Sequence, residues 1–303
     1  MLDYASLAAV AAVIQEGSFE SAARFLNVTP SAVSQRVKLL EERLGRILIV
    51  RGQPCKPTEA GKLLCRHVER VGMLEQDLRH SLPQLLQSDS KDARVTLRVA
   101  VNADSLGTWF IAAMAAFASD EHALLDVAVD DQEHTAQWLR SGDVLAAVTA
   151  TADPVQGCDT VSLGKLQYVA VANPAFVEKY FSAGVTAQTL AHAPSLRFDR
   201  KDGLQGQWVR QVCRREVELP VHWLPSTQAF VDAAVAGIGW AMNPASLVEA
   251  HLSEGSLVQL VPGRVLSVPL YWQHTRLQVP MLDRLTRAVL TAAHAALRPE
   301  RRK

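Results

Sequence analysis

The chain has 303 residues, 49% of them apolar, and its 31 basic residues balance its 31 acidic residues, so the formal net charge is zero. This length exceeds that of a single DNA-binding module and is enough to bury the cores of two or three domains. The longest apolar run near the N-terminus, residues 7–14, is too short to span a bilayer, and the four cysteines show neither C-x-x-C pairing nor the histidine spacing of a zinc site. We therefore expect a cytoplasmic protein with reduced thiols, no metal and no membrane partner.

Three helices with a tight turn between the second and third are predicted near the amino terminus. A bracing helix over about residues 2–16 ends at Gly17, which suits the left-handed position that follows a helix. Ser18 can cap the second helix, and Thr29 and Pro30 supply the cap and the first position of the third. Because only about three residues separate the second and third helices, the pattern is typical of a helix-turn-helix.

The third helix is the predicted DNA-reading helix. Val33, Val37 and Leu40 recur at i, i+4 and i+7 and should face inward. The outer face then carries Ser31, Ser34, Gln35 and Lys38, with Arg36 at its flank. Residues 20–66 contain nine basic residues against four acidic ones, and such a local excess of positive charge is what contacts to phosphates require.

A wing and a long helix are predicted next. Residues 46–51 are rich in β-branched side chains, which favours a strand, and residues 52–57 form a turn. Arg51 and Lys56 are therefore placed to contact a phosphate or the minor groove, the alternative being two solvated loop charges. Helical spacing then continues from about residue 58 to 87, before a polar linker at residues 87–92; Pro83 weakens the end of this helix. Its apolar stripe favours a dimerisation helix over a helix packed on its own domain. The stripe consists of Leu64, Val68, Val71, Leu74 or Glu75, Leu78, Leu82 and Leu85.

Beyond the linker, strands and helices alternate. The first set has predicted strands at residues 94–101, 124–129 and 144–149 and predicted helices at about 105–118 and 134–140. The second set has predicted strands at 168–172, 221–224 and near Trp240, and predicted helices at about 174–181, 205–216 and 226–236. A strand at 270–273 and a helix at 280–297 complete the chain. This order predicts a mostly parallel sheet with helices on both faces, in two lobes that enclose a cleft.

Two strand-to-helix junctions are candidate ligand sites, because ligands of such sheets lie beyond the carboxyl ends of the strands, at helix N-termini. In residues 101–109, Ser105 is the expected cap, and in residues 225–230, Ser226 and Thr227 supply hydroxyls. Each junction could hold a carboxylate, and the alternative for each is an ordinary helix cap.

Acidic residues gather at the same strand ends, at Asp104, at Asp130 with Asp131, and at Asp199 with Asp202. These carboxylates would repel a simple organic acid, so together with an anion-binding helix terminus they predict a zwitterion with an extra positive charge, such as a basic amino acid. The alternative is that they are solvated loop acids. The predicted effector-binding residues are Asn102, Asp104, Ser105, Thr108, Trp109, Asp130, Asp131, His134, Asp199, Ser226 and Thr227.

Other functional classes find less support in the sequence. An enzyme or a small-molecule binding protein could also be built on two α/β lobes, but the chain lacks a G-x-S-x-G elbow, an H-E-x-x-H pair and a P-loop, and Gly237-Ile238-Gly239 lacks the third glycine of a dinucleotide fingerprint. A transport binding protein would not need the DNA-reading helices. A DNA-packaging protein without a regulatory role is a further alternative.

Taken together, these motifs resemble those of the LysR-type transcriptional regulators, and the resemblance covers essentially the whole chain. The most specific segments are residues 18–42, which hold the two-helix motif, and Pro57-Thr58-Glu59-Ala60-Gly61 at the start of the long helix. The ArgP/LysG branch senses lysine or arginine and controls the export of basic amino acids. The segments that are similar to this branch are residues 99–105, 130–135, 226–231 and 270–272.

The resemblance implies a winged helix-turn-helix, a linker helix that dimerises, and a two-lobed effector domain like that of periplasmic binding proteins. The expected boundaries are 1–58, 59–89 and 90–303, with lobe I at about 93–162 and 269–303 and lobe II at about 163–268. Such a regulator is not an enzyme, has no cofactor, binds promoter DNA as a dimer or a dimer of dimers, and has RNA polymerase as a candidate partner. Its expected effector is L-lysine or L-arginine, and another small metabolite is the alternative.

The resemblance also implies DNA contacts from the reading helix and the wing. Gln35 departs from the pattern of many relatives, which carry arginine there; glutamine suits an adenine edge, whereas arginine suits guanine. With Thr29 and Lys38 added from the helix geometry, the predicted DNA-binding residues are Thr29, Pro30, Ser31, Ser34, Gln35, Arg36, Lys38, Arg51 and Lys56.

Overall fold

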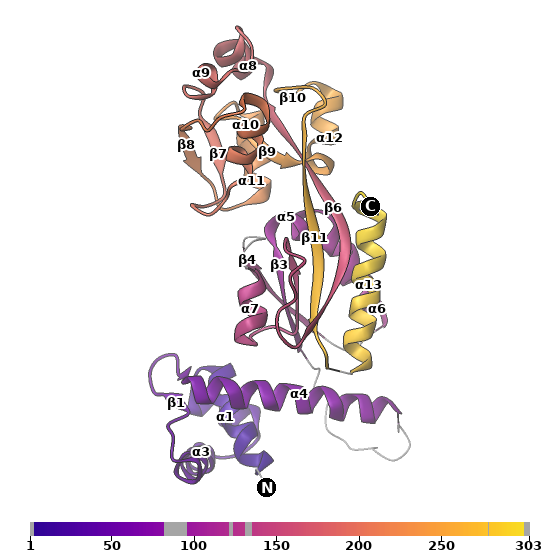
Figure 1. The fold of residues 1–303 in the computed structure, drawn as a ribbon. Coiled ribbons are helices and arrows are strands. Elements are labelled where there is room, and N and C mark those ends of the chain that lie inside the picture. The colour runs from indigo at the N-terminus through magenta and orange to yellow at the C-terminus, as the bar shows by residue number, and fades with distance from the viewer. Residues whose placement is uncertain (1–2, 82–95, 121–123, 131–134, 278, 300–303) are drawn as a thin grey trace. The chain divides into compact units, whose positions relative to one another are not determined.

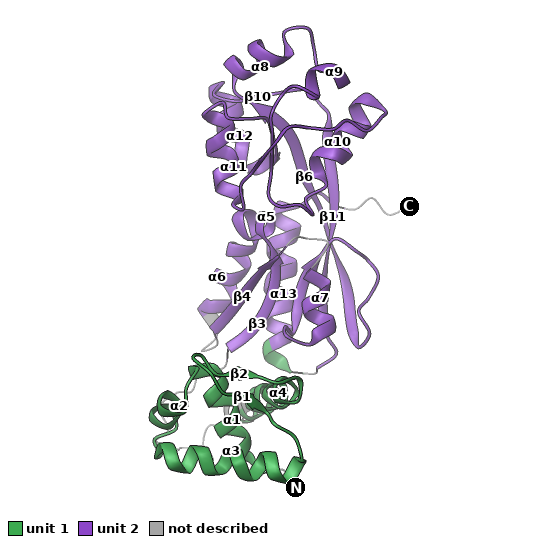
Figure 2. Cartoon of the chain, turned by 90° about the vertical axis from the view of Figure 1, so that its left-hand side faces the viewer, with its two compact units in different colours: residues 1–95, 279–281 green, residues 96–278, 282–303 purple. Residues whose placement is uncertain are grey.

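The computed structural model describes residues 3–81, 96–120, 124–130, 135–277 and 279–299 (Figure 1). The chain divides into two compact units, residues 1–95 with 279–281 and residues 96–278 with 282–303 (Figure 2). No helix within the described ranges is both long and apolar enough to cross a bilayer.

The first unit begins with the three predicted helices, α1 (Tyr4–Glu16), α2 (Phe19–Phe25) and α3 (Pro30–Leu44). The predicted caps are confirmed: the Ser18 hydroxyl accepts from the Ser21 backbone N–H at 3.1 Å, and the Thr29 hydroxyl accepts from that of Ala32 at 3.2 Å. Each cap satisfies a backbone donor that the first turn of a helix leaves without a partner.

Glycine ends two of these helices, and the first of these ends, at Gly17, was predicted. Gly17 and Gly45 follow α1 and α3 with φ values of 74° and 63°, a left-handed conformation that residues with a Cβ rarely adopt. The apolar faces of the three helices meet in one core, which contains Leu7, Val10, Val13, Ala22, Ala23, Val33, Val37, Leu40 and Leu48.

A two-stranded wing and a long helix complete this unit. Strand β1 (Ile49–Val50) pairs antiparallel with β2 (Lys56–Pro57), and α4 (Glu59–Ser81) follows. The predicted apolar stripe of α4 has two parts: Leu64 and Val68 pack against the helix-turn-helix core, whereas Leu74 and Leu78 are 48% and 51% exposed. The predictions for Leu82, Pro83, Leu85 and the linker at residues 87–92 lie outside the described residues.

The second unit has two lobes, each with its own hydrophobic core. Lobe I contains β3 (Thr96–Asn102), β4 (Leu124–Asp130), β5 (Ala146–Thr149), α5 (Ala103–Ser105), the π-helical turn η1 (Leu106–Phe110), α6 (Ile111–Asp120), α7 (Thr135–Ser141) and α13 (Pro280–Ala296). Lobe II contains α8 (Pro174–Phe181), α9 (Ala187–Leu190), β7 (Ser195–Arg197), α10 (Leu204–Cys213), β8 (Val221–Trp223), α11 (Thr227–Val235), β9 (Ala241–Pro244), α12 (Ala245–Glu254) and β10 (Val258–Gln259).

Two long strands connect the lobes. Strand β6 (Cys158–Ala172) and strand β11 (Val265–Thr275) pair with each other antiparallel and run through both lobes (Figure 1). The main sheet has the order β10-β6-β11-β5-β3-β4, and β9 also pairs with β6.

The prediction of a mostly parallel sheet is therefore correct only in part. Strand β3 is parallel to β4 and β5, and β7 is parallel to β8, but β6, β9, β10 and β11 all pair antiparallel. The physical reason is the connection between the lobes: the chain enters lobe II along β6 and returns along β11, so these neighbouring strands run in opposite directions.

Candidate nucleic-acid interface and ligand cavity

Helix α3 presents a polar face to solvent, as its sequence pattern predicts. Ser31, Gln35 and Lys38 are exposed and Ser34 and Arg36 are half-buried, while Val33, Val37 and Leu40 are buried. The exposed set also includes Thr29 and Pro30 at the start of the helix. The polar face therefore consists of short hydroxyls and one amide, with cationic residues beside them, which is the chemistry that reads base edges and phosphates.

The cationic residues near this face are held weakly. Lys38 Nζ lies 3.7 Å from Glu42 Oε1, with both side chains more than half exposed. Arg51 in the wing is exposed, and its guanidinium lies over the Phe19 ring at 5.3 Å from the ring centroid. Lys56 in β2 is also exposed. Exposed ion pairs contribute little to stability, so Lys38 can exchange Glu42 for a phosphate at small cost.

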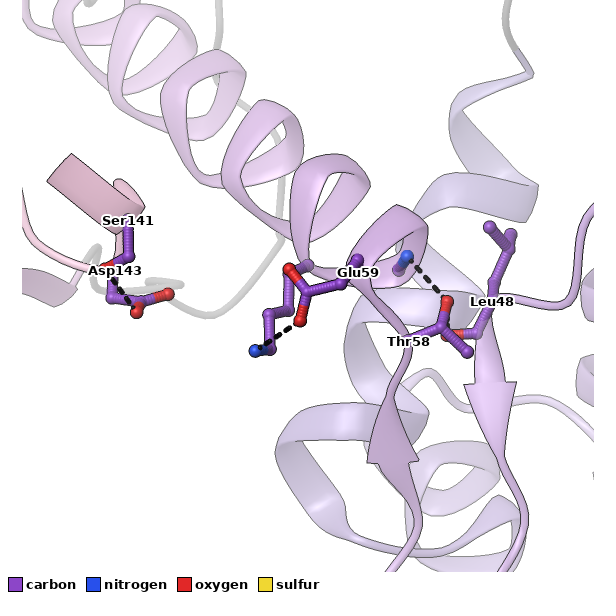
Figure 3. Close-up of polar contacts among 7 residues, drawn as sticks. Leu48, Thr58, Glu59, Ser141 and Asp143 are labelled. Atoms are coloured by element: carbon purple, nitrogen blue, oxygen red, sulfur yellow. Dashed lines mark hydrogen bonds and ion pairs between the residues drawn. The ribbon is translucent and has the colours of Figure 1, made fainter. Parts of the chain in front are cut away.

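Hydrogen bonds at Thr58 fix the wing against the start of α4 (Figure 3). The Thr58 hydroxyl donates to the carbonyl oxygen of Ile47 at 2.8 Å, and the carbonyl oxygen of Leu48 is a second acceptor at 3.2 Å. The same hydroxyl accepts from the Gly61 backbone N–H at 3.1 Å. One residue further on, Glu59 pairs with Lys62 at 2.9 Å. Thr58 thus acts both as the cap of α4 and as the anchor of the wing.

The second unit contains a cavity between lobe I and lobe II that is partly open to solvent. Lobe I contributes residues from the ends of β3 and β4, and lobe II contributes residues from the loop before α10, from α10 and α11, and from β9. The lining residues are Asn102, Ala103, Asp104, Asp130, Phe198, Lys201, Asp202, Gly203, Leu204, Gln207, Thr227, Phe230, Met242 and Asn243.

Asp104 joins the two sides of this cavity. Its carboxylate accepts hydrogen bonds from the Tyr168 hydroxyl at 2.7 Å and from the Thr227 hydroxyl at 2.9 Å. Tyr168 belongs to β6 and Thr227 opens α11 in lobe II, so one carboxylate of lobe I contacts both the connecting strand and the opposite lobe. Asp130 lies beside Asn102 in the parallel register of β3 and β4, and its carboxylate accepts from the Trp138 indole N–H at 3.0 Å.

Asp202 has a different role, because it orders the loop that lines lobe II. This carboxylate is 7% exposed and accepts from the backbone N–H groups of Phe198 at 3.0 Å and Leu204 at 3.1 Å, and from the Gln205 amide at 3.1 Å. Three donors stabilise its negative charge inside the protein. The neighbouring Lys201 is exposed and lines the cavity.

Two buried amides in the cavity wall have hydrogen-bonding atoms without partners. Asn243 in β9 is fully buried, and neither its Oδ1 nor its Nδ2 has a partner among the described residues. Asn102 at the end of β3 is 3% exposed, and its Oδ1 likewise has none. Buried polar groups of folded proteins are almost always hydrogen-bonded, so these atoms are able to bind polar groups of a molecule or water that enters the cavity.

Four of the predicted effector residues line the cavity: Asn102, Asp104, Asp130 and Thr227. Ser226 caps α11 through a hydrogen bond from the Ala229 N–H at 3.3 Å, and Asp199 accepts from the N–H groups of Lys201 and Asp202 within its own loop. Neither residue is among those that line the cavity. Asp131 and His134 lie outside the described residues.

The predictions around Ser105 need correction. Helix α5 begins at Ala103 with Asn102 in the cap position, so Ser105 lies inside the helix, fully buried, and does not cap it. The sequence runs on through η1, where the Thr108 hydroxyl donates to the Asp104 carbonyl oxygen at 2.6 Å and Trp109 is 3% exposed, packed edge-on against Phe110. Thr108 and Trp109 therefore make contacts within lobe I and are not among the residues that line the cavity.

Most residues of the lobe II wall were not predicted from the sequence as effector-binding residues. The residues concerned are Phe198, Lys201, Asp202, Gly203, Leu204, Gln207, Phe230, Met242 and Asn243. Asp202 was noted as one of the acidic residues at the strand ends, but it was not among the predicted effector-binding residues. The others have no local signal, because pairing of β9 with β6 and of β7 with β8 brings them to one surface from separate segments.

Comparison with known proteins matches the same two parts of the chain. The family model for the bacterial regulatory helix-turn-helix protein, lysR family, matches residues 4–62, and the model for the LysR substrate binding domain matches residues 90–294. The HTH-type transcriptional regulator LysG of Mycobacterium tuberculosis is 44% identical over 303 residues, which cover 100% of this chain and 97% of that protein.

Solved structures agree with this comparison. The crystal structure of ArgP from Mycobacterium tuberculosis matches with a TM-score of 0.81 at 43% identity and covers 99% of this chain and 100% of its own. Full-length LysG from Corynebacterium glutamicum, with bound effector Arg, matches with a TM-score of 0.69 at 37% identity, covering 98% and 100% of the two chains.

Proposed function

The chain belongs to the LysR family of bacterial transcriptional regulators, and we propose that the amino acid that controls its action on promoter DNA is a basic one, L-arginine or L-lysine. The cavity between the lobes is the proposed effector site. On the resemblance to the ArgP/LysG branch, we also propose that its target genes serve the export of basic amino acids.

One observation carries this proposal: two carboxylates, those of Asp104 and Asp130, line a cavity at the ends of neighbouring parallel strands. A ligand that brings a cation to these carboxylates gains charge-assisted hydrogen bonds. The bound effector Arg of a regulator that is 37% identical to this chain supports the same ligand class.

In the proposed mechanism the first unit reads DNA and the second unit senses the effector. Residues 1–58 would read DNA, 59–89 would pair with the same segment of a second copy, and 90–303 would bind the effector. The exposed Leu74 and Leu78 on α4 support the pairing, since they extend an apolar stripe beyond the helix-turn-helix core. A ligand that binds one arrangement of the lobes better than another shifts the population toward it and so changes how two reading helices meet their half-sites.

Calorimetric titration of the full chain tests the effector class. We expect L-arginine or L-lysine to bind and L-norleucine, which has an apolar side chain of comparable length, to bind at least ten-fold more weakly. Promoter footprints recorded with and without the bound amino acid should differ in extent or in sites of enhanced cleavage. Equal affinity for norleucine, or no binding of either basic amino acid, would contradict the proposal.

Gln35→Ala is expected to relax base preference at the operator position that Gln35 reads, because a bidentate contact to an adenine edge discriminates by about 1–3 kcal/mol. Selection from random operators measures this preference. Lys38→Ala is the matched comparison on the same helix face: it should weaken binding to all sequences alike and lower the slope of log affinity against log salt concentration by about one. An unchanged preference in Gln35→Ala would show that this side chain reads no base.

A further inference from the structure

The two walls of the cavity differ in the charges and polar groups that they offer. Among the described residues that line it, lobe I contributes Asp104 and Asp130 and no basic side chain, whereas lobe II contributes Lys201, the amides of Gln207 and Asn243, and an apolar surface. The remaining acid of lobe II, Asp202, already accepts three hydrogen bonds from its own loop and from Gln205. The cavity is therefore anionic on one side and carries its available cation on the other.

We propose that the effector lies across the cavity in one orientation, with its α-carboxylate on lobe II at Lys201 and Asn243 and its side-chain cation on lobe I at Asp104 and Asp130. This inference rests on the proposed function, that is, on a basic amino acid as the effector. In this orientation Lys201 and Asn243 bind the carboxylate of the ligand. The protein should therefore discriminate between an amino acid and the amine that remains after its decarboxylation.

Asn243 favours the α-carbon end of the ligand. Its carboxamide offers one donor and one acceptor, both buried and both without a partner among the described residues. The α-carbon of an amino acid carries the matching pair, since the carboxylate accepts from Nδ2 and the ammonium donates to Oδ1. A guanidinium or a side-chain ammonium only donates and would leave Nδ2 unsatisfied.

Lys201 favours a carboxylate on the same wall. Its backbone N–H donates to Asp199, which fixes the main chain of the loop, while its ammonium has no ion pair among the described residues. An ammonium at the cavity edge would repel the side-chain cation of arginine or lysine and attract the α-carboxylate. Leu204, Phe230 and Met242 lie on the same wall and provide apolar contact for the methylene chain between the charged ends.

Titration of the full chain with L-arginine and with agmatine, the same molecule without its carboxylate, tests the orientation. Wild type should bind agmatine about ten- to a hundred-fold more weakly than arginine. Lys201→Met should weaken arginine binding by about ten-fold or more and change agmatine binding less than two-fold. If agmatine binding releases too little heat for calorimetry, the rise of the thermal unfolding temperature with agmatine concentration measures its affinity instead. The matched control is Lys179→Met, an exposed lysine of α8 that lies over the Tyr180 ring, and it should change neither affinity.

Asn243→Leu provides a second, independent measurement. Because both amide atoms lack partners, an apolar side chain of similar volume should leave the unfolding midpoint unchanged or raise it, while arginine binding falls at least ten-fold. An equal loss for arginine and agmatine in Lys201→Met, unaltered arginine binding in either variant, or a lowered midpoint in Asn243→Leu would overturn the orientation. If wild type binds neither arginine nor lysine, the proposed function itself fails.

Discussion

Replacing Gly61 with alanine is expected to lower the stability of the helix-turn-helix unit by about 3 kcal/mol, at the upper end of the usual cost of overpacking. A Cβ at this position would lie 2.1 Å from the carbonyl oxygen of Leu48. Real Cβ atoms do not approach a backbone oxygen so closely, and a backbone atom cannot turn aside as a side chain can. Either α4 or the wing must move.

The displacement would break several hydrogen bonds, because Leu48 is held from three directions. Its carbonyl oxygen accepts from the Thr58 N–H at 2.9 Å and lies 3.2 Å from the Thr58 hydroxyl, and its N–H donates to Glu41 Oε1 at 2.7 Å. Glu41 belongs to α3, so movement of Leu48 is transmitted to the DNA-reading helix. We therefore expect Gly61→Ala to weaken DNA binding as well as to lower stability.

Gly72→Ala is the matched control on the same helix. A Cβ at Gly72 meets no atom within 4 Å, and alanine in a helix interior is favoured over glycine by about 0.5–1 kcal/mol, so this variant should be slightly more stable than wild type. The same glycine-to-alanine change should lower stability at position 61 and raise it at position 72. This comparison distinguishes the effect of the steric clash from that of helix propensity.

The chain itself provides a means of observing each unit. All six tryptophans lie within residues 109–272, so their fluorescence reports unfolding of the second unit, whereas far-ultraviolet circular dichroism reports the helices of both. In urea, Gly61→Ala should shift part of the dichroism transition to lower concentration and leave the fluorescence transition in place. A dichroism transition identical to that of wild type would show that the Leu48 region accommodates the added methyl group.

The first unit could be predicted from sequence almost completely because its signals are local. Ser18 and Thr29 cap helices through N–H groups three residues away, and Gly17 and Gly45 end helices through their own backbone conformation. Each of these depends on a few consecutive residues. The close approach of Gly61 to Leu48 had no such signal, since it depends on how the wing packs on α4.

The cavity could be predicted only on its lobe I side. Asn102, Asp104 and Asp130 follow parallel strands whose order is evident from the sequence, so their meeting could be expected. The prediction for Ser105 was wrong because α5 starts directly at the end of β3, before the serine that would ordinarily mark a cap. Lys201 and Asn243 come from a loop and a short strand of lobe II, and only tertiary pairing brings them to the same wall.

Asp104→Asn is expected to weaken binding of a basic amino acid by about ten- to a hundred-fold, which corresponds to the loss of one charge-assisted contact of roughly 1.5–3 kcal/mol. Asparagine has nearly the same shape and keeps one oxygen that can accept from Tyr168 or Thr227, so the lobes should retain most of their present contact. What it removes is the negative charge that faces the side-chain cation.

Calorimetry with arginine and norleucine distinguishes charge from shape. Asp104→Asn should lose affinity for arginine but not for norleucine, so the preference between them should shrink, and affinity for promoter DNA without effector should stay near that of wild type because Asp104 belongs to the second unit. Asp126→Asn is the control: it removes the same charge from lobe I at an exposed position of β4, where Asp126 pairs with Arg98 at 3.0 Å. Arginine affinity that is equal in wild type and Asp104→Asn, or reduced equally in both variants, would remove Asp104 from the effector site.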